Sequence, residues 1–237
     1  MMSTPTFRPA STRQCWRQTI GMLMLPMLGL ALTGCGSLWP AASPQPAFFT
    51  LQAVPGPAEV ARNMSRSAVA PALAGASPVL LVHVPSAAPG FDSARIMYTS
   101  QPHRLEYFAR HEWVDAPARM LAPLMVAALE RGTGFSAVVL APSVATGGVQ
   151  LHTQLLRLQQ EFAAPPSQVR LALRAQLVDT RSRQVLATRD FEHVSVSASE
   201  DAPGGVAAAQ LAAHAVLTEL AAWCQAALAA PRGSAAR

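Results

Sequence analysis

The second half of the chain contains a regular alternation of apolar and polar side chains that restricts it to a sheet with one buried face. Between residues 169 and 177, every second residue is Val, Leu or Ala, and the positions between them carry Arg, Gln or Ala. Because successive side chains of a strand point to opposite faces, this pattern predicts a strand with one buried face and one solvated face. Residues 179–183 are predicted to turn, so that residues 184–196 return beside this strand as its antiparallel partner.

Further strands are predicted on the N-terminal side of this hairpin. Residues 149–160 alternate in the same way, but their apolar phase slips at Leu155 and Leu156, which indicates a β-bulge. Residues 55–77 are rich in Pro, Ala, Ser and Gly and are predicted to form a loop. Gln101-Pro102-His103 supplies a hairpin turn between two of the remaining strands. These remaining strands are predicted over residues 48–54, 79–84, 95–100, 104–109 and 135–140.

Two helices are predicted from apolar positions that recur with helical spacing. Asp115 is expected to cap a helix over residues 116–131, and Gly132 to end it as a C′ residue. Pro123 inside this helix is expected to kink it. A second helix is predicted over residues 205–229. The sequence therefore predicts a single α/β domain, with a mixed, mostly antiparallel sheet and helices packed on it. The apolar stripe of the second helix comprises Ala213, Val216, Leu217, Leu220, Trp223, Cys224 and Leu228.

The N-terminus has the three-part pattern of a secretory signal peptide. Residues 1–19 are polar with three Arg, and residues 20–32 form an apolar run. As a helix, this run would span roughly 20 Å at about 1.5 Å per residue, which is shorter than the ~30 Å hydrocarbon core of a bilayer. Pro26 and two glycines inside the run disfavour the alternative, a buried helix of a soluble core. We therefore expect a cleaved leader rather than a spanning helix.

The four residues Leu32-Thr33-Gly34-Cys35 directly follow this run and resemble the bacterial lipobox. The resemblance implies that the Cys35 sulfur is acylated with fatty acids such as palmitate. It also implies that the leader, residues 1–34, is removed, so that Cys35 becomes the first residue of the mature chain. Several acyl chains hold a protein firmly on a bilayer, whereas one chain binds only marginally.

The segment that follows is predicted to be a tether to the folded domain. Residues 35–47 contain three Pro and no periodicity, and the 12 residues after Cys35 could reach roughly 40 Å at about 3.3 Å each. The domain itself is expected over residues 48–230. Gly36 stands where an Asp would favour retention in the inner membrane. The resemblance to such lipoproteins therefore implies the outer membrane, with the protein facing the periplasm.

Charge and motifs argue against a nucleic-acid-binding or catalytic protein. The formal net charge is +5, but Arg8, Arg13 and Arg17 precede Cys35 and no acidic residue does, so removal of the leader lowers the charge by 3, to +2. The sequence has no basic run of the kind that neutralises phosphates. Its six His have no zinc-ligand spacing, and it has no phosphate-binding loop or nucleophile motif. We therefore expect no nucleic-acid partner, no enzyme activity, no cofactor and no metal, with Cys224 as a buried apolar residue.

The middle of the chain carries aromatic and proline residues in a characteristic order. A strand ends in Tyr, a Leu-x-Tyr strand follows, and a Trp then precedes a Pro at the start of an amphipathic helix and a later strand. This order is similar to the core of the ABC-type transport auxiliary lipoproteins, the PqiC-like family. The positions that carry the resemblance are Tyr98, Leu105, Tyr107, Trp113 and Pro117.

The resemblance covers residues 46–230 together with the lipobox, and it implies a function. Its members act beside an ABC transporter and an MCE-type partner, in systems that move lipids or other hydrophobic molecules between the inner and outer membranes. Tyr98, Tyr107 and Trp113 are then candidates for a partner interface, because Tyr and Trp are favoured anchors at interfaces. Packing in the core is the alternative role for these three residues.

Other functions stay open at this point. One is a chaperone or structural partner of another outer-membrane complex, and another is a lipid-anchored hydrolase. A homo-oligomer, such as a ring around a channel, would suit a docking component, although no residue indicates it.

Overall fold

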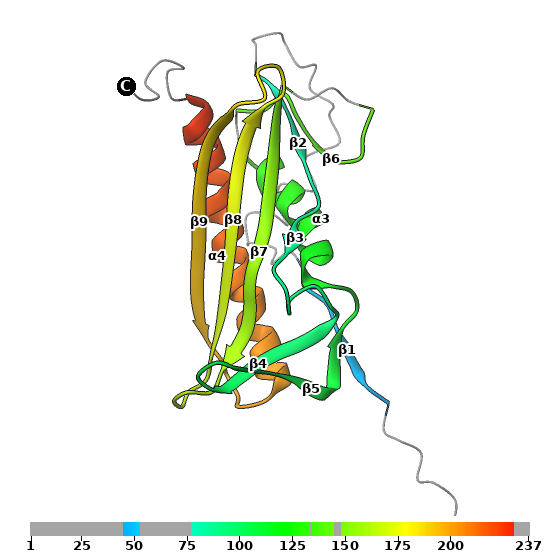
Figure 1. Ribbon diagram of the computed structural model, residues 1–237, viewed down its shortest axis with the longest axis vertical. Helices are drawn as coiled ribbons and strands as arrows, with labels where there is room; N and C mark the ends of the chain where they lie inside the picture. Colours follow the sequence, from blue (N-terminus) through cyan, green and yellow to red (C-terminus); the bar gives the residue numbers. More distant parts are fainter. Residues whose placement is uncertain (1–44, 53–76, 133, 145–147, 230–237) are drawn as a thin grey trace, which may run out of the picture. The chain divides into compact units, whose positions relative to one another are not determined.

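The computed structural model describes residues 45–52, 77–132, 134–144 and 148–229. In these residues, a mixed sheet of nine strands has two helices packed on it (Figure 1). The leader, the lipobox, nearly all of the tether and the predicted loop up to residue 76 lie outside the described residues. The elements in chain order are β1 (Ala47–Phe49), β2 (Val79–Val82), β3 (Ser86–Ala87), β4 (Arg95–Gln101), β5 (Arg104–Trp113), α3 (Pro117–Glu130), β6 (Ala137–Leu140), β7 (Val149–Glu161), β8 (Gln168–Asp179), β9 (Val185–Val196) and α4 (Ala202–Ala229).

The sheet is organised around β7, which pairs along both of its edges. On one edge, β7 pairs antiparallel with β8, and β8 pairs antiparallel with β9. On the other edge, β2, β3 and β4 pair in parallel with successive parts of β7. β6 adds to β2 in parallel, and β5 of the β4–β5 hairpin pairs with β1 on its other edge. The longest pairings are therefore antiparallel, as predicted, and the parallel pairings are short.

The core lies between the two helices and one face of the sheet (Figure 1). The alternation predicted for residues 169–177 is confirmed, because its apolar residues are buried while its arginines and glutamine are exposed or half-buried. Phe191 of β9 packs edge to face against Trp223 of α4, with ring centroids 5.7 Å apart. Pro123 lies on the exposed side of α3, and the helix continues through it.

α4 lies close to the sheet because its first half consists mainly of Ala and Gly. A Cβ atom at Gly205 would lie 2.1 Å from Oε1 of the buried Gln160 side chain. The helix begins at Ala202, earlier than predicted, and the Gly204 N–H in its first turn donates a hydrogen bond to the Asp201 carboxylate at 2.9 Å. By length and composition α4 could also span a bilayer, with a mean hydropathy of 1.3 in its apolar part, but 56% of that part is buried inside the domain.

Two local predictions are confirmed by the strand register. β4 and β5 form the predicted hairpin around Gln101-Pro102-His103. In β7, the consecutive residues that pair with β8 are Leu155 and Arg157, which leaves Leu156 as the extra residue of a bulge. The slip of the apolar phase in the sequence thus corresponds to a real irregularity of the sheet.

The strand predicted over residues 48–54 is shorter than expected. β1 ends at Phe49, because Leu51 turns into the core. The backbone N–H of Gln52 then donates to the side-chain oxygen of Gln210 on α4, at 2.9 Å, instead of to a neighbouring strand. The end of the predicted strand lies outside the described part of the chain.

The prediction for the start of α3 is wrong, and the prediction for its end is confirmed. Its N-cap is Ala116, without a side-chain cap, and Asp115 lies one residue earlier. There, the Asp115 carboxylate accepts a hydrogen bond from the Ala116 N–H at 2.7 Å and another from the Arg119 guanidinium. The carboxylate therefore binds these groups instead of capping the helix. At the C-terminal end the C-cap is Arg131, so Gly132 is the C′ residue, and its N–H donates to the Leu129 carbonyl at 3.1 Å.

The packing of α4 on the sheet generates a stability prediction. Leu220 is fully buried and Leu211, on the same helix, is 57% exposed. We expect Leu220→Ala to lower the free energy of unfolding by about 2–5 kcal/mol, because it removes buried methyl groups and leaves a cavity. Leu211→Ala is the matched control and should change it by less than about 0.5 kcal/mol. Urea denaturation followed by circular dichroism measures both, and equal effects would contradict the placement of α4.

Candidate functional site

The β4–β5 hairpin has an outer face that carries Tyr107. Met97 pairs with Tyr107 and Arg95 pairs with Glu112, and cross-strand partners have their side chains on the same face. The guanidinium carbon of Arg95 lies 4.1 Å from the centroid of the Tyr107 ring, a cation–π contact. Tyr107 nevertheless stays 48% exposed, so much of its ring is available to another molecule.

Three further apolar side chains extend this surface along β5 and onto β1. Phe48 is the register partner of Glu112, Leu105 lies two residues before Tyr107, and Val114 lies two residues after Glu112. Their positions place them on the same face as Tyr107, and their exposed fractions are 61% for Phe48, 42% for Leu105 and 58% for Val114. We call Phe48, Leu105, Tyr107 and Val114 the outer apolar face.

The other two aromatic candidates lie on the opposite face of the hairpin, so the structure does not bring the three together. Trp113 is 3% exposed and belongs to the core, which is the alternative role considered for it. Tyr98 is half-buried, with its ring centroid 4.7 Å from that of Phe108 and 5.7 Å from that of Phe162. Of the three predicted interface residues, Tyr107 is therefore the one whose ring is freely exposed.

Two members of the outer apolar face, Phe48 and Val114, are not among the residues that the sequence singles out. The sequence signal that could have indicated them is alternation, because Phe48 lies in a predicted strand and Val114 follows Glu112 at a spacing of two. The parallel pairing of β1 with β5 brings these positions together, and no local pattern indicates that pairing.

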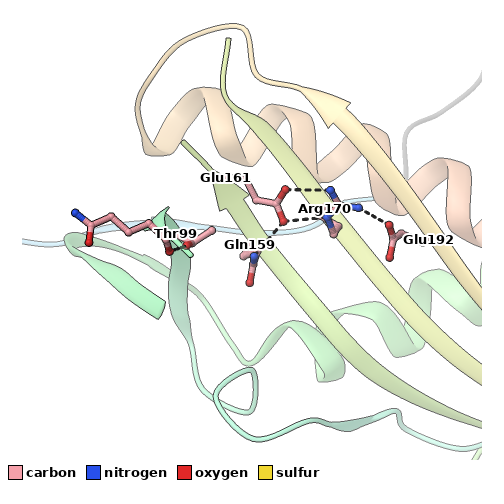
Figure 2. Close-up of polar contacts among 6 residues, drawn as sticks. Thr99, Gln159, Glu161, Arg170 and Glu192 are labelled. Atoms are coloured by element: carbon pink, nitrogen blue, oxygen red, sulfur yellow. Dashed lines mark hydrogen bonds and ion pairs between the residues drawn. The ribbon is translucent and has the colours of Figure 1, made fainter. Parts of the chain in front are cut away.

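The face of β7–β9 that points away from the helices carries matched charges, beside the exposed Val194 and Val196 at the end of β9 (Figure 2). Arg170 of β8 donates through Nε to Oε1 of Glu161 on β7, at 2.9 Å, and it also pairs with Glu192 on β9. Arg174 donates two hydrogen bonds of 2.7 Å to the Asp190 carboxylate. The hydrogen bond between Glu161 and Arg170 holds the pKa of Glu161 below the ordinary value of 4.5, and the same bond raises the pKa of Arg170. The pairs leave this face electrically balanced.

A polar hollow of about 310 Å³ lies on the same face, beside the pairing of β7 with β3. The rings of His83 and His152 stack with centroids 4.2 Å apart, and burial, followed by the charge of His83, lowers the pKa of His152. Ser86 Oγ donates to the Thr153 carbonyl at 3.4 Å and not to a histidine. Within the described residues, the hollow thus holds no nucleophile paired with a base. It is lined by Ser86, His152, Thr153, Gln154, Arg174 and Gln176.

Cys224 and the other potential metal ligands form no reactive centre in the described part of the chain. Cys224 is fully buried on α4, as predicted, and burial raises the pKa of its thiol to about 12. The thiol is therefore protonated at neutral pH and is a poor nucleophile. No group of three His, Cys, Asp or Glu side chains among the described residues could hold a metal ion.

Taken together, the described residues form an α/β domain whose distinctive features are surfaces for contact. They are the outer apolar face and the open face of the long strands with its ion pairs. The family model of the ABC-type transport auxiliary lipoprotein component matches residues 63–221, well over half of the chain. The chain belongs to this family, which confirms the resemblance seen in the sequence.

Two solved structures extend the comparison. The chain is 28% identical to protein XCC0632 from Xanthomonas campestris, of family DUF330, whose crystal structure matches with a TM-score of 0.59 over 67% of this chain and 90% of that chain. The crystal structure of an uncharacterized protein matches with a TM-score of 0.57, at 10% identity, over 76% of this chain and 99% of that one. The second likeness shows the fold alone. No curated protein matches the sequence.

Family membership fixes the general role of the protein. It is an auxiliary lipoprotein component of an ABC-type transport system, and as a lipoprotein it is anchored to a membrane of the envelope. The family's description as an auxiliary transport component implies a non-catalytic role.

The cross-strand ion pairs generate a pH prediction. Because the folded-state pKa of Glu161 is lowered, its ionised form stabilises the fold above about pH 4.5, and this contribution is lost as the pH falls through the lowered pKa. We expect Arg170→Gln to lower the free energy of unfolding at pH 7 by about 1–2 kcal/mol. It should also flatten the loss of stability between about pH 5 and pH 3.

Urea denaturation at a series of pH values measures this effect, with Arg174→Gln as the control. The Arg174–Asp190 pair joins two strands in the same way but is more exposed, so its loss should cost less. An Arg170→Gln variant with the acid sensitivity of the unsubstituted protein would contradict the assignment.

Proposed function

We propose that the mature protein is anchored by acyl chains on Cys35 to the outer membrane, where it faces the periplasm as the auxiliary component of an ABC transporter with an MCE-type partner. The system would move lipids or other hydrophobic molecules between the two membranes. The observation that carries this proposal is the coincidence of the family match with the lipobox Leu32-Thr33-Gly34-Cys35. Gly36, where an Asp would favour the inner membrane, supports the outer membrane.

The arrangement of the chain suits a docking component. The proposed leader ends at residue 34, residues 35–47 serve as the tether, and the domain over residues 48–230 offers its surfaces within reach of the membrane. The outer apolar face, with Tyr107 at its centre, is the proposed contact surface. Tyr98 and Trp113 support it from the opposite face of the hairpin, and the open face of β7–β9 with its ion pairs stays hydrated.

Acylation of Cys35 is tested by labelling cells with radioactive palmitate. We expect the full-length chain to incorporate the label and to fractionate with the outer membrane. Cys35→Ala should lose the label and keep its leader, because the acceptor sulfur is absent. Cys224→Ala is the control and should be labelled normally, since its thiol is buried in the core. An unlabelled native chain, or one that fractionates with the inner membrane, would overturn this part of the proposal.

The partners are tested by purifying the tagged, acylated protein from envelopes solubilised in a mild detergent. We expect the MCE-type protein and the transporter permease of the same genome to be recovered with it, and an unrelated acylated lipoprotein to recover neither. The mass of the purified complex reports whether several copies assemble. Recovery of another outer-membrane complex, without the MCE-type protein, would favour the alternative role of chaperone or structural partner.

A further inference from the structure

We propose that the outer apolar face lies against the headgroup region of the phospholipid bilayer that holds the anchor, so that the domain rests on the membrane instead of hanging from its tether. The inference rests on the proposed acylation of Cys35 and names the partner of the proposed contact surface. It gives a function to Phe48, Leu105 and Val114, which the family resemblance and the comparisons leave without a role.

The first argument is the concentration of exposed apolar side chains on one surface. Phe48, Leu105, Tyr107 and Val114 lie on the same face of the β1–β5–β4 part of the sheet, and each is more than 40% exposed. An exposed apolar patch of this kind marks a contact site with another molecule or with a membrane. The four side chains come from two neighbouring strands and their flanking residue, so they can meet a flat surface together.

The second argument is the chemistry around these apolar residues. Arg95 stacks over Tyr107 on this face, which places a guanidinium directly beside the apolar side chains. Of the two acidic residues of β5, Glu112 is the register partner of Arg95, whereas Glu106 is the partner of Tyr98 and pairs with Arg104 at 3.0 Å on the opposite face. Tyr and Arg flanking apolar side chains match the headgroup level of a bilayer, where the ring lies at the interface and the guanidinium meets phosphate.

The third argument is the length of chain between the anchor and the first strand. β1 begins at Ala47, only 12 residues after Cys35. For 12 residues of random-coil chain the end-to-end distance is about 20 Å, which would hold β1 close to the bilayer. Tethering at this distance creates a high effective concentration, and a small apolar patch then suffices for stable contact. The turn between β8 and β9 lies at the far end of strands about 40 Å long, so the same tether does not hold it at the bilayer.

The test uses nitroxide side chains as depth probes in the acylated protein. Single variants Phe48→Cys, Tyr107→Cys and Val114→Cys are labelled, with Thr188→Cys and Gln176→Cys on the open face of β7–β9 as matched controls. Each protein is reconstituted into vesicles of phosphatidylethanolamine and phosphatidylglycerol. Electron paramagnetic resonance then compares collisions with oxygen, which concentrates in the bilayer, and with a water-soluble nickel chelate, which does not. The native chain, whose Cys224 is buried, gives the labelling background.

We expect the ratio of oxygen to nickel collisions to be several-fold higher at positions 48, 107 and 114 than at positions 176 and 188. Equal ratios at all five positions would overturn the inference. Loss of access to both reagents at 48, 107 and 114 would also overturn it, since that pattern means a protein partner or a second copy covers the face.

Mass spectrometry of the same protein preparations, which shows whether Cys35 is acylated, distinguishes failure of this inference from failure of the proposed function. If Cys35 carries its acyl chains and the probes on the outer apolar face match the controls, the proposed anchoring stands and the membrane contact fails. If Cys35 is found unmodified, the proposed anchoring fails, whatever the probes report.

Discussion

The contact between α4 and the long strands β7–β9 is the interaction on which the rest of the structure depends. Leu171 and Phe191 on the strands and Val216 and Leu220 on the helix are all buried at this contact. The Ala- and Gly-rich first half of α4 lets the helix backbone approach the sheet, as at Gly205, where Gln160 occupies the space of a Cβ. Because one helix buries one face of three strands, apolar and polar side chains must alternate along these strands. Their other face is exposed to solvent.

That constraint explains why the two exposed sheet surfaces differ in character. On the open face of β7–β9, every acidic side chain of the ladder has an arginine partner, for example Glu161 with Arg170 and Asp190 with Arg174. The hairpin of β4 and β5 joins the sheet through the end of β7, where Tyr98 pairs with Gln160, and its outer face carries apolar residues instead. Solvent alone would favour polar residues at both surfaces. A group of exposed apolar residues on one face, like that on the hairpin, is typical of a contact surface.

The parts of the fold that the sequence predicted are those set by local periodicity. The strand over residues 169–177, the bulge at Leu156 and the helix near the C-terminus all follow from the spacing of apolar residues, which depends only on how the chain is buried on each side. The two-residue strand β3 escaped prediction because a segment that short has no period. The end of β1 was missed because it depends on contacts far away in the chain: Leu51 enters the core and Gln52 bonds Gln210 on α4.

The outer apolar face was less predictable than the strands, because it also depends on contacts between residues far apart in the chain. Tyr107 lies in the strand predicted over residues 104–109, whereas Trp113 lies beyond it and belongs to the longer β5. Their burial differs because the extra residues of β5 between them change the face on which each side chain lies. Phe48 joins Tyr107 through the parallel pairing of β1 with β5, which links residues far apart in the chain. Predicting whether a single aromatic residue is buried therefore requires knowledge of the strand pairing. Predicting that the residue lies in a strand does not.

The unpaired edge of β9 completes the account of the surfaces in the described residues. A strand of 12 residues with a free edge invites pairing with a second copy. An antiparallel two-fold pairing centred on Asp190, Phe191 or Glu192 would place two acidic side chains directly opposite each other, a destabilising arrangement. Their arginine partners lie on β8 and are already engaged. These three registers are therefore disfavoured at the β9 edge.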